Sequence, residues 1–344
     1  IYTLSLHDAL PIYELVLHVN NIARIGSALV RQARSRGLDW SLYDTARTDP
    51  RWSARTRALR RALRGAAWET GLARRALGTD LLDVHGATVT AHTRWLRLPY
   101  VLHLHGSDIR RRQYEERYAP LVRRAVLEAC DVYYTTPDLA EHVAGLRQEA
   151  TLQPVIVDTT EIPQAVAADG PARFLFPSRW DASKGGAMQI AVLAALRSAY
   201  GGSLLLEGLD WGQDAGQAAA HGVKLLPKMG HGAYVRWIAS GTAAIGQMTG
   251  CMGVSELEAI GSGVSLIMAL NPQWYDGAHP TTRDVPVLAG PVAPAEAVDA
   301  IVEAVGQVLN GERVNGGRQW VAEHHSPAAA VDRLLSRPVF GGSH

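Results

Sequence analysis

The 344-residue sequence has few cysteines and no long apolar run. Cys130 and Cys251 are its only cysteines, which excludes a disulfide-rich scaffold and a cysteine-rich zinc site and favours a reducing compartment. The apolar stretches fall short of the roughly 18 residues that a membrane-spanning helix needs. The composition, 47% hydrophobic and 19% charged, excludes disorder, collagen and coiled coil. The length predicts two domains.

Net charge is also small, at +1, but it is unevenly distributed along the chain. Residues 1–150 contain 22 arginines, no lysine and 16 acidic residues, a balance of +6, whereas residues 151–344 have a balance of −5. This asymmetry predicts two domains with different partners. Lysine is scarce throughout, because Lys184, Lys224 and Lys228 are the only three.

The first residues do not read as part of a fold. Residues 2–12, YTLSLHDALPI, resemble one reading frame of a sequencing adapter, so we treat residues 1–12 as an artefact. They do not predict a signal peptide, because His7 and Asp8 stand where an apolar core is needed. The sequence therefore does not establish the true N-terminus.

Short apolar runs alternate with stretches of helical periodicity in both halves of the chain. This alternation predicts parallel sheets covered on both faces, in two doubly wound domains at 13–165 and 166–325, followed by a C-terminal helix and tail at 326–344. The predicted strands are Leu15–Val19, Leu81–Val84, Tyr100–Leu104, Val132–Thr136, Arg173–Phe176, Leu204–Leu206, Val223–Leu226, Ala243–Ile245 and Val264–Met268. The predicted helices include Ile22–Arg36, Tyr118–Ala129, Ala187–Ala199, Ser255–Ile260 and Ala295–Leu309.

The usual phosphate-binding fingerprints GxGxxG and GxxxxGK[ST] are absent. In their place, the segment 176–186 (FPSRWDASKGG) follows a predicted strand and opens a helix. Arg179 and Lys184 are thus expected at the carboxyl edge of a sheet, where open α/β folds bind ligands. A planar guanidinium and a point charge suit a diphosphate. The alternative is two solvated surface cations, although a lysine retained in so lysine-poor a chain slightly favours function.

A second segment, 250–263 (GCMGVSELEAIGSG), places glycines on both sides of a predicted helix start. Ser255 and Glu258 stand three residues apart, which predicts a capping box. The functional interpretation is that the helix N-terminus offers N–H groups and a positive dipole end to an anion. Glu258 would then accept hydrogen bonds from ribose hydroxyls.

Together these two segments resemble the donor domain of retaining GT-B glycosyltransferases, specifically glycosyltransferase family 4 (group 1). Further matches are the loop at Gly26–Ser27 and the segments Leu104–Asp108, Thr136–Leu139 and His324–Ser326. The resemblance implies two Rossmann-like doubly wound domains facing each other across a cleft. It also implies a hexosyl- or related transferase that uses a nucleotide-diphosphate sugar, with retention and without a metal or other cofactor.

The resemblance also assigns roles to residues. It implies that Arg179 and Lys184 hold the diphosphate and support the departing charge, and that His105 reaches the transferred sugar. The implied donor-binding residues are Gly26, Arg179, Lys184, Gly253, Val254, Ser255 and Glu258. The acceptor (a glycan, a lipid-linked molecule or a small molecule) is not indicated.

The sequence departs from this family at one position. Gly250 stands where the family has the first of two glutamates, which contacts hydroxyls of the donor sugar; Gln247 is the candidate substitute. A nucleotide-sugar epimerase on the same fold and a catalytically impaired GT-B-like binding protein therefore remain alternatives.

A histidine pair and an arginine-rich segment also allow functional interpretations. His103 and His105 stand two residues apart in an extended segment, so their side chains share one face, and Asp108 is nearby. Because no other residue has the spacing of a third or fourth ligand, we expect no metal. A metal-dependent hydrolase is the alternative. Arg51–Arg64 predicts a basic amphipathic helix, either a solvated face or a peripheral contact with the anionic inner face of a membrane. Arginines without interleaved aromatics argue against nucleic acid, and a cytoplasmic location is expected.

Overall fold

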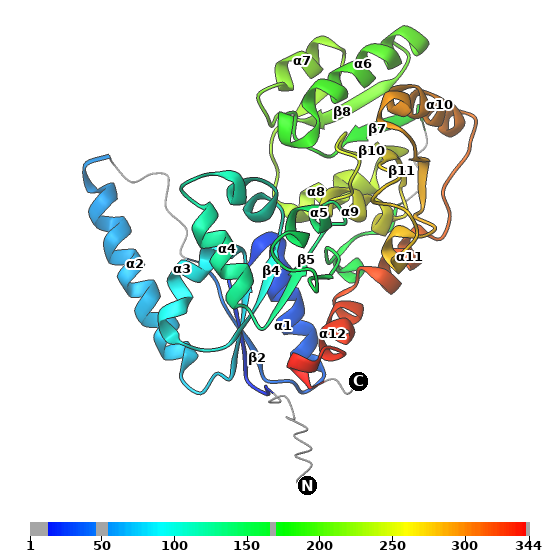
Figure 1. The fold of residues 1–344 in the computed structure, drawn as a ribbon. Helices are drawn as coiled ribbons and strands as arrows, with labels where there is room; N and C mark the ends of the chain where they lie inside the picture. The colour runs from blue at the N-terminus through cyan, green and yellow to red at the C-terminus, as the bar shows by residue number, and fades with distance from the viewer. Residues whose placement is uncertain (1–12, 46–53, 166–169, 342–344) are drawn as a thin grey trace. The chain divides into compact units, whose positions relative to one another are not determined.

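The computed structural model describes residues 13–45, 54–165 and 170–341. The adapter-like segment and residues 51–53 of the predicted arginine helix lie outside this part of the chain. The structure forms two compact units. The first contains the described residues up to Thr135, then Leu139–Gln153 and the chain from Ala330; the second contains Thr136–Asp138 and Pro154–Ala329. Figure 1 shows the elements of both units along the chain.

The first unit is built on a six-stranded parallel sheet with the order β2-β1-β3-β4-β5-β6. Strands β1, β3 and β4 are buried along their whole length, which explains why most of their residues are apolar. The direction of the strand order reverses between β1 and β3. The strands are β1 (Val16–Val19), β2 (Trp40–Tyr43), β3 (Leu81–His85), β4 (Tyr100–Leu104), β5 (Asp131–Tyr134) and β6 (Thr151–Leu152).

Helices of the first unit are α1 (Ile25–Ser35), α2 (Ala54–Ala76), α3 (Thr90–Thr93), α4 (Ala119–Glu128), α5 (Leu139–Ala144) and most of α12 (Pro327–Leu335). Helix α2 continues well beyond the predicted end at Arg64. Its second half packs on the core through Leu72, whereas Leu59 and Leu63 in its first half are exposed. Packing in the tertiary structure therefore extends this helix.

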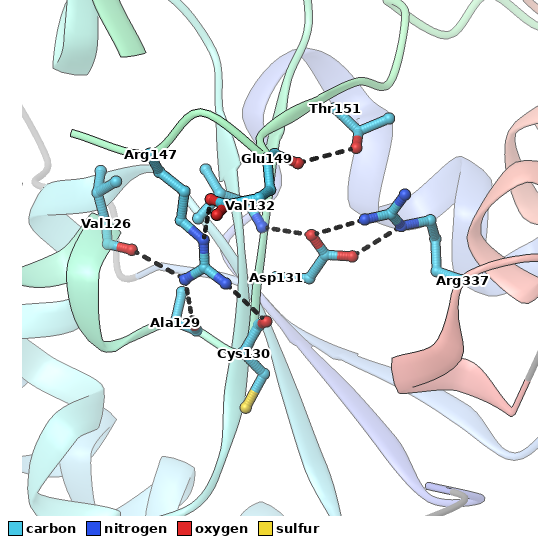
Figure 2. A network of polar contacts seen from close by, with 9 residues as sticks. All are labelled: Val126, Ala129, Cys130, Asp131, Val132, Arg147, Glu149, Thr151 and Arg337. Carbon is cyan, nitrogen blue, oxygen red and sulfur yellow. Dashed lines mark hydrogen bonds and ion pairs between the residues drawn. The ribbon is translucent and has the colours of Figure 1, made fainter. Parts of the chain in front are cut away.

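The C-terminal segment returns to the first unit and is fastened there by charged groups. Figure 2 shows Arg337 donating from Nε and Nη2 to the two oxygens of Asp131, at 2.8 and 3.2 Å. In the same network Arg147 donates to the carbonyls of Ala129 and Cys130 after α4. Phe340 packs against Trp40 with 5.5 Å between ring centroids. The predicted C-terminal tail is thus part of the first unit's core.

The second unit has its own six-stranded parallel sheet, with the order β12-β11-β10-β7-β8-β9. The strand order reverses between β10 and β7, which is the arrangement of dinucleotide-binding folds. The strands are β7 (Arg173–Phe176), β8 (Leu205–Leu209), β9 (Lys224–Leu226), β10 (Ala243–Ile245), β11 (Ser265–Leu270) and β12 (Val287–Pro291). Strands β2, β6 and β12 were not predicted. β2 is partly exposed, β6 has only two residues, and β12 is partly exposed and ends in Gly290 and Pro291.

Helices cover both faces of this sheet. They are α6 (Gly186–Tyr200), α7 (Ala215–Ala220), α8 (His231–Ala239), α9 (Val254–Ser262), α10 (Ala297–Leu309) and α11 (Gly317–His324). Alternate residues of β7 enter opposite cores: Phe174 and Phe176 pack in one cluster and Leu175 in the other. None of the described helices is long and apolar enough to cross a membrane.

Candidate functional site

The two predicted motifs meet at the point where the strand order of the second sheet reverses. Segment 176–186 leaves the carboxyl end of β7, and segment 250–263 follows β10, its neighbour in the sheet. In open α/β sheets, ligands bind outside the carboxyl ends of the strands at such a switch point. The topology therefore places both motifs where a ligand is expected.

The backbone holds the two loops together next to Lys184. The Lys184 carbonyl accepts a hydrogen bond from the Met248 amide at 3.0 Å. Gly185 has φ +77°, and a Cβ there would lie 2.5 Å from the Met248 carbonyl oxygen. Only glycine fits this left-handed position and close approach.

The Lys184 side chain reaches the start of α9. Its Nζ donates to Gln247 Oε1 at 2.5 Å and would lie 3.8 Å from a Cβ on Gly253, the residue that precedes the helix. The side-chain amide nitrogen of Gln247, Nε2, donates in turn to the Cys251 carbonyl. Gln247 thus positions the ammonium group at the N-terminus of α9. There the first amides have no acceptor within the helix and the helix dipole is positive.

The predicted capping box at Ser255 and Glu258 is wrong. Helix α9 begins at Val254, so Gly253 is the N-cap and Glu256 the third helical residue. The buried Glu256 carboxylate accepts from the backbone amides of Gly253 at 2.9 Å and Gln247 at 3.1 Å, and from Ser178 Oγ at 3.0 Å. The sequence pattern misled because Ser255, although a good capping residue, lies inside the first turn.

Glu258 therefore has no capping role. Its carboxylate lies on the side of α9 that faces α8, where Oε1 is 2.6 Å from His231 Nε2. The glutamate side chain is nearly buried while the imidazole is 40% exposed, so the pair lies at the surface of the unit. The carboxylate can accept further hydrogen bonds at this position.

Arg179 is held within its own loop. Its guanidinium lies 3.0 Å from the Asp181 carboxylate, donates to Ser183 Oγ at 2.7 Å and stacks over Trp211 at 5.4 Å from the ring centroid. These contacts fix the direction of the side chain and leave it 37% exposed. It is oriented and accessible at the carboxyl end of β7.

At Gly250 the structure explains the absence of a glutamate. The residue has φ +74°, and a Cβ would lie 3.0 Å from Asn271 Cβ and 3.3 Å from Asn271 N. Any larger side chain would be strained here. Beside it is a cavity of about 260 Å³ with largely apolar walls, lined among others by Met188, Met248, Trp274 and Pro294.

In the first unit, Gly26 lies in the first turn of α1. A Cβ at this residue would be 3.0 Å from the Asn20 carbonyl oxygen and 3.1 Å from Leu42 Cδ1. The glycine is therefore required for packing within its own unit. Gly26 therefore has a structural role in addition to the ligand contact that the resemblance implies.

His105 follows β4 and contacts a second histidine. Its Nε2 lies 3.1 Å from His85 Nδ1. Burial, followed by the nearby His103, lowers the pKa of His105 to about 3. The ring is therefore neutral at physiological pH, so one of its nitrogens donates a hydrogen bond and the other accepts one.

The metal grouping of His103, His105 and Asp108 that was weighed from the sequence does not form. Asp108 is used by the backbone, since its carboxylate accepts from the Ala87 amide at 3.1 Å and the Ile109 amide at 3.0 Å. His103 Nε2 instead lies 3.2 Å from Asp83 Oδ1. Sequence reasoning missed Asp83, although an acidic residue inside an apolar run was a visible signal.

Asp83 is fully buried among imidazoles. Burial by itself raises the pKa of this carboxyl, but the nearby His103, His18 and His85 outweigh it and hold the pKa well below its usual range. Burial lowers the pKa of His18 to about 4, although Asp83 opposes this shift. Inside the first unit, the pKa of the Asp83 carboxyl and the pKa of the His18 ring are thus both lowered.

Comparison with known proteins gives a fold. No family model and no curated protein matches the sequence. Among solved structures, sucrose-phosphate synthase from Thermosynechococcus elongatus is 15% identical with a TM-score of 0.68, covering 96% of this chain and 100% of that one. HepE from Anabaena, solved in complex with UDP, is 14% identical with a TM-score of 0.62, covering 93% and 98%. The fold is GT-B.

A third structural neighbour is described as an epimerase. It is a putative UDP-N-acetylglucosamine 2-epimerase from Listeria monocytogenes, 13% identical with a TM-score of 0.58, covering 94% of this chain and 95% of that one. At such identities the likeness establishes the fold alone. The prediction of two Rossmann-like doubly wound domains is thereby confirmed, and the reaction has to be argued from the site.

Proposed function

We propose that this GT-B protein is a glycosyltransferase that moves a sugar from a nucleotide-diphosphate donor to an acceptor hydroxyl. One observation carries the proposal: Lys184 is held at the N-terminus of α9, at the switch point of the second sheet. A cation beside a helix N-terminus is a binding site for a phosphate-type anion. The UDP bound to the neighbour HepE makes UDP the first nucleotide to try.

In this proposal the second unit supplies the charge for the reaction. The bond between the sugar's anomeric carbon and the diphosphate oxygen breaks, a bond to the acceptor oxygen forms, and the acceptor proton is released. Lys184 and Arg179 stabilise the negative charge that develops on the leaving diphosphate. Amides of Val254 and Ser255 face the same anion, while Gly253, whose own amide is bonded to Glu256, lets the backbone approach it closely. Glu258 accepts from the ribose, and the neutral His105 and Gly26 serve the transferred sugar and its acceptor.

The proposal includes retention and needs no metal at the diphosphate. The acceptor is a glycan, a lipid-linked molecule or a small molecule, and the enzyme acts in the cytoplasm. Gln247 acts here by holding Lys184, since both ends of its side-chain amide are bonded, and it does not take over the contact of the glutamate missing at Gly250. The apolar cavity beside Gly250 favours a donor sugar with few hydroxyls on that side. Exposed arginines of α2, such as Arg60, Arg61 and Arg64, provide peripheral contact with anionic membrane.

The test is calorimetric titration of UDP and, separately, of inorganic pyrophosphate. Because Lys184 contacts the diphosphate, Lys184→Met is expected to weaken both ligands by about 10- to 100-fold, the value of a charge-assisted hydrogen bond. Glu258→Gln is expected to weaken UDP and leave pyrophosphate unchanged, because its partner is the ribose. The different responses of the two ligands thus separate the diphosphate contact of Lys184 from the ribose contact of Glu258 in one experiment.

Two matched variants control the titration. Lys224→Met removes a lysine that is 70% exposed and pairs with Glu207, and Glu303→Gln alters an exposed helix glutamate. Both are expected to bind like wild type. The donor site would be refuted if wild type bound none of UDP, GDP and ADP, or if Lys184→Met behaved as Lys224→Met does.

The epimerase alternative is favoured by the fold of the Listeria neighbour and has its own readout. Incubation with UDP-sugars and no acceptor, followed by chromatography, shows a new UDP-sugar only if the protein is an epimerase. Release of UDP that depends on an added acceptor identifies a transferase. The anomeric configuration of that product, read by NMR, then tests retention, and an inverted centre would contradict it.

A further inference from the structure

Four ionisable side chains are buried together inside the first unit, on strands that meet at its own switch point. We call them the histidine cluster: His18 on β1, Asp83 and His85 on β3, and His103 on β4. Their exposed fractions are 0, 0, 0 and 1%. His18 is in register with Asp83, and His85 with His103, so neighbouring strands place the four side chains on one face.

The separations among His18, Asp83 and His85 are those of ligands around one metal ion, since one ligand atom of each lies within 4.8 Å of the others. His18 Nδ1 lies 3.2 Å from His85 Nε2 and 3.4 Å from Asp83 Oδ2. His85 Nε2 is 3.4 Å, and His103 Nε2 is 3.2 Å, from Asp83 Oδ1. Four ligands bonded tetrahedrally at about 2.0–2.1 Å to zinc lie about 3.3 Å from one another.

The cluster also leaves several buried polar atoms without a hydrogen-bond partner. Both Asp83 oxygens and both His103 nitrogens have no hydrogen bond of acceptable geometry within the described part of the chain. A buried carboxylate needs a cationic partner or a set of hydrogen bonds. The groups around this one are imidazoles whose ring nitrogens point at it, a donor set suited to a borderline divalent metal.

We propose that the histidine cluster binds one divalent transition-metal ion of the zinc class. Its ligands are His18 Nδ1, His85 Nε2 and the Asp83 carboxylate, and a shift of the His103 ring, whose Nε2 contacts Asp83 Oδ1, completes the set. This set differs from the His103, His105 and Asp108 grouping, with which it shares only His103. It is a closed structural site, since none of its members is accessible to substrate.

The surroundings fit such a role. Trp40 packs on the His18 ring at 5.0 Å between centroids, and Tyr133 on the His103 ring at 4.8 Å, so both imidazoles are restrained. A metal on His85 Nε2 leaves Nδ1–H to donate to His105 Nε2, 3.1 Å away. The ion thereby joins β1, β3 and β4 and fixes the orientation and tautomer of His105.

The experiment measures metal in the full chain, produced without a polyhistidine tag. Elemental analysis is expected to find close to one zinc-class ion per chain. After chelation and addition of Co²⁺, we expect the intense visible absorption of four-coordinate cobalt, saturating at one equivalent, and a higher Tm than in the metal-free protein. Protein that contains no metal and gives no cobalt spectrum would overturn the proposal, and protonated imidazoles would then balance Asp83.

Variants locate the ion. His18→Gln and Asp83→Asn keep the approximate shape of each side chain and are expected to lose the stoichiometric metal and the cobalt spectrum. His92→Gln, which alters a 60% exposed ring, is expected to keep both. Full metal binding by folded His18→Gln and Asp83→Asn would contradict the site. If either variant fails to fold, the cobalt titration of wild type still decides, and nucleotide binding reports separately on the donor site.

Discussion

The two units use the same architecture but treat the switch point of the sheet in opposite ways. In the first unit the strand order reverses at β1 and β3, and the ionisable groups lie within the strands as the histidine cluster, fully buried. In the second it reverses at β10 and β7, where the strands are apolar and the charges of Arg179 and Lys184 stand on the following loop. One backbone plan therefore carries its ionisable groups either inside the sheet or on the loops beyond it.

What decides between them is the position of the polar residue relative to the end of the strand. A charge inside a buried strand must be compensated internally, whereas a charge on the loop beyond the strand can meet solvent or a ligand. The units differ in continuity as well, since the first is completed by the C-terminal return through Arg337. The second is formed almost entirely by one continuous stretch.

The largest expected effect tests whether the second unit's site depends on backbone geometry. Gly185→Ala places a Cβ in a left-handed position, 2.5 Å from the Met248 carbonyl oxygen, and is expected to lower the free energy of unfolding by about 3 kcal/mol. Gly316→Ala is the matched control, because its φ of +75° and ψ of −3° are also left-handed but a Cβ there meets open space; about 1 kcal/mol is expected. Urea denaturation of both variants measures the difference, and equal losses would show that the close approach is unimportant.

A smaller effect sharpens the contrast in continuity. Arg337→Ala leaves the carboxylate of Asp131, whose side chain is 10% exposed, without its bidentate partner and is expected to destabilise the first unit by about 2 kcal/mol. Arg36→Ala removes the pairing with Asp332 at the surface and is expected to cost less than about 1 kcal/mol. Thermal unfolding followed by circular dichroism compares the two. Arg337→Ala as stable as wild type would mean that the C-terminal return is not needed.

The smallest effect concerns the charge asymmetry between the halves. Arg61→Gln, on the exposed part of α2, is expected to reduce co-sedimentation with anionic vesicles about fivefold at low salt, the value of one arginine near such a surface. Arg313→Gln, a half-exposed arginine of the second unit, is expected to have no effect. If wild type does not sediment with the vesicles at low salt, α2 is only a solvated face.

Most of the fold was predictable because buried strands of a parallel sheet leave continuous apolar runs. Such runs located β1, β3 and β4 and, in the second unit, β7, β10 and β11. The edge strands β2 and β12 were missed because half-buried residues leave no such pattern. The N-cap of α9 was misplaced because Ser255 and Glu256 are both suitable capping residues. Glu256 takes this role because its carboxylate is also bonded to Ser178 and Gln247 from other loops.

The candidate donor site was predictable only as a set of positions. The sequence by itself determined the class of fold, the location of Arg179 and Lys184 after a strand, and the absence of the usual phosphate fingerprints, because these depend on order and spacing along the chain. The tertiary structure alone decided that Gln247 holds Lys184 at the start of α9, and that His18, Asp83, His85 and His103 share one buried face. Such contacts depend on which strands are neighbours and in what register, and that is settled by packing of the whole sheet.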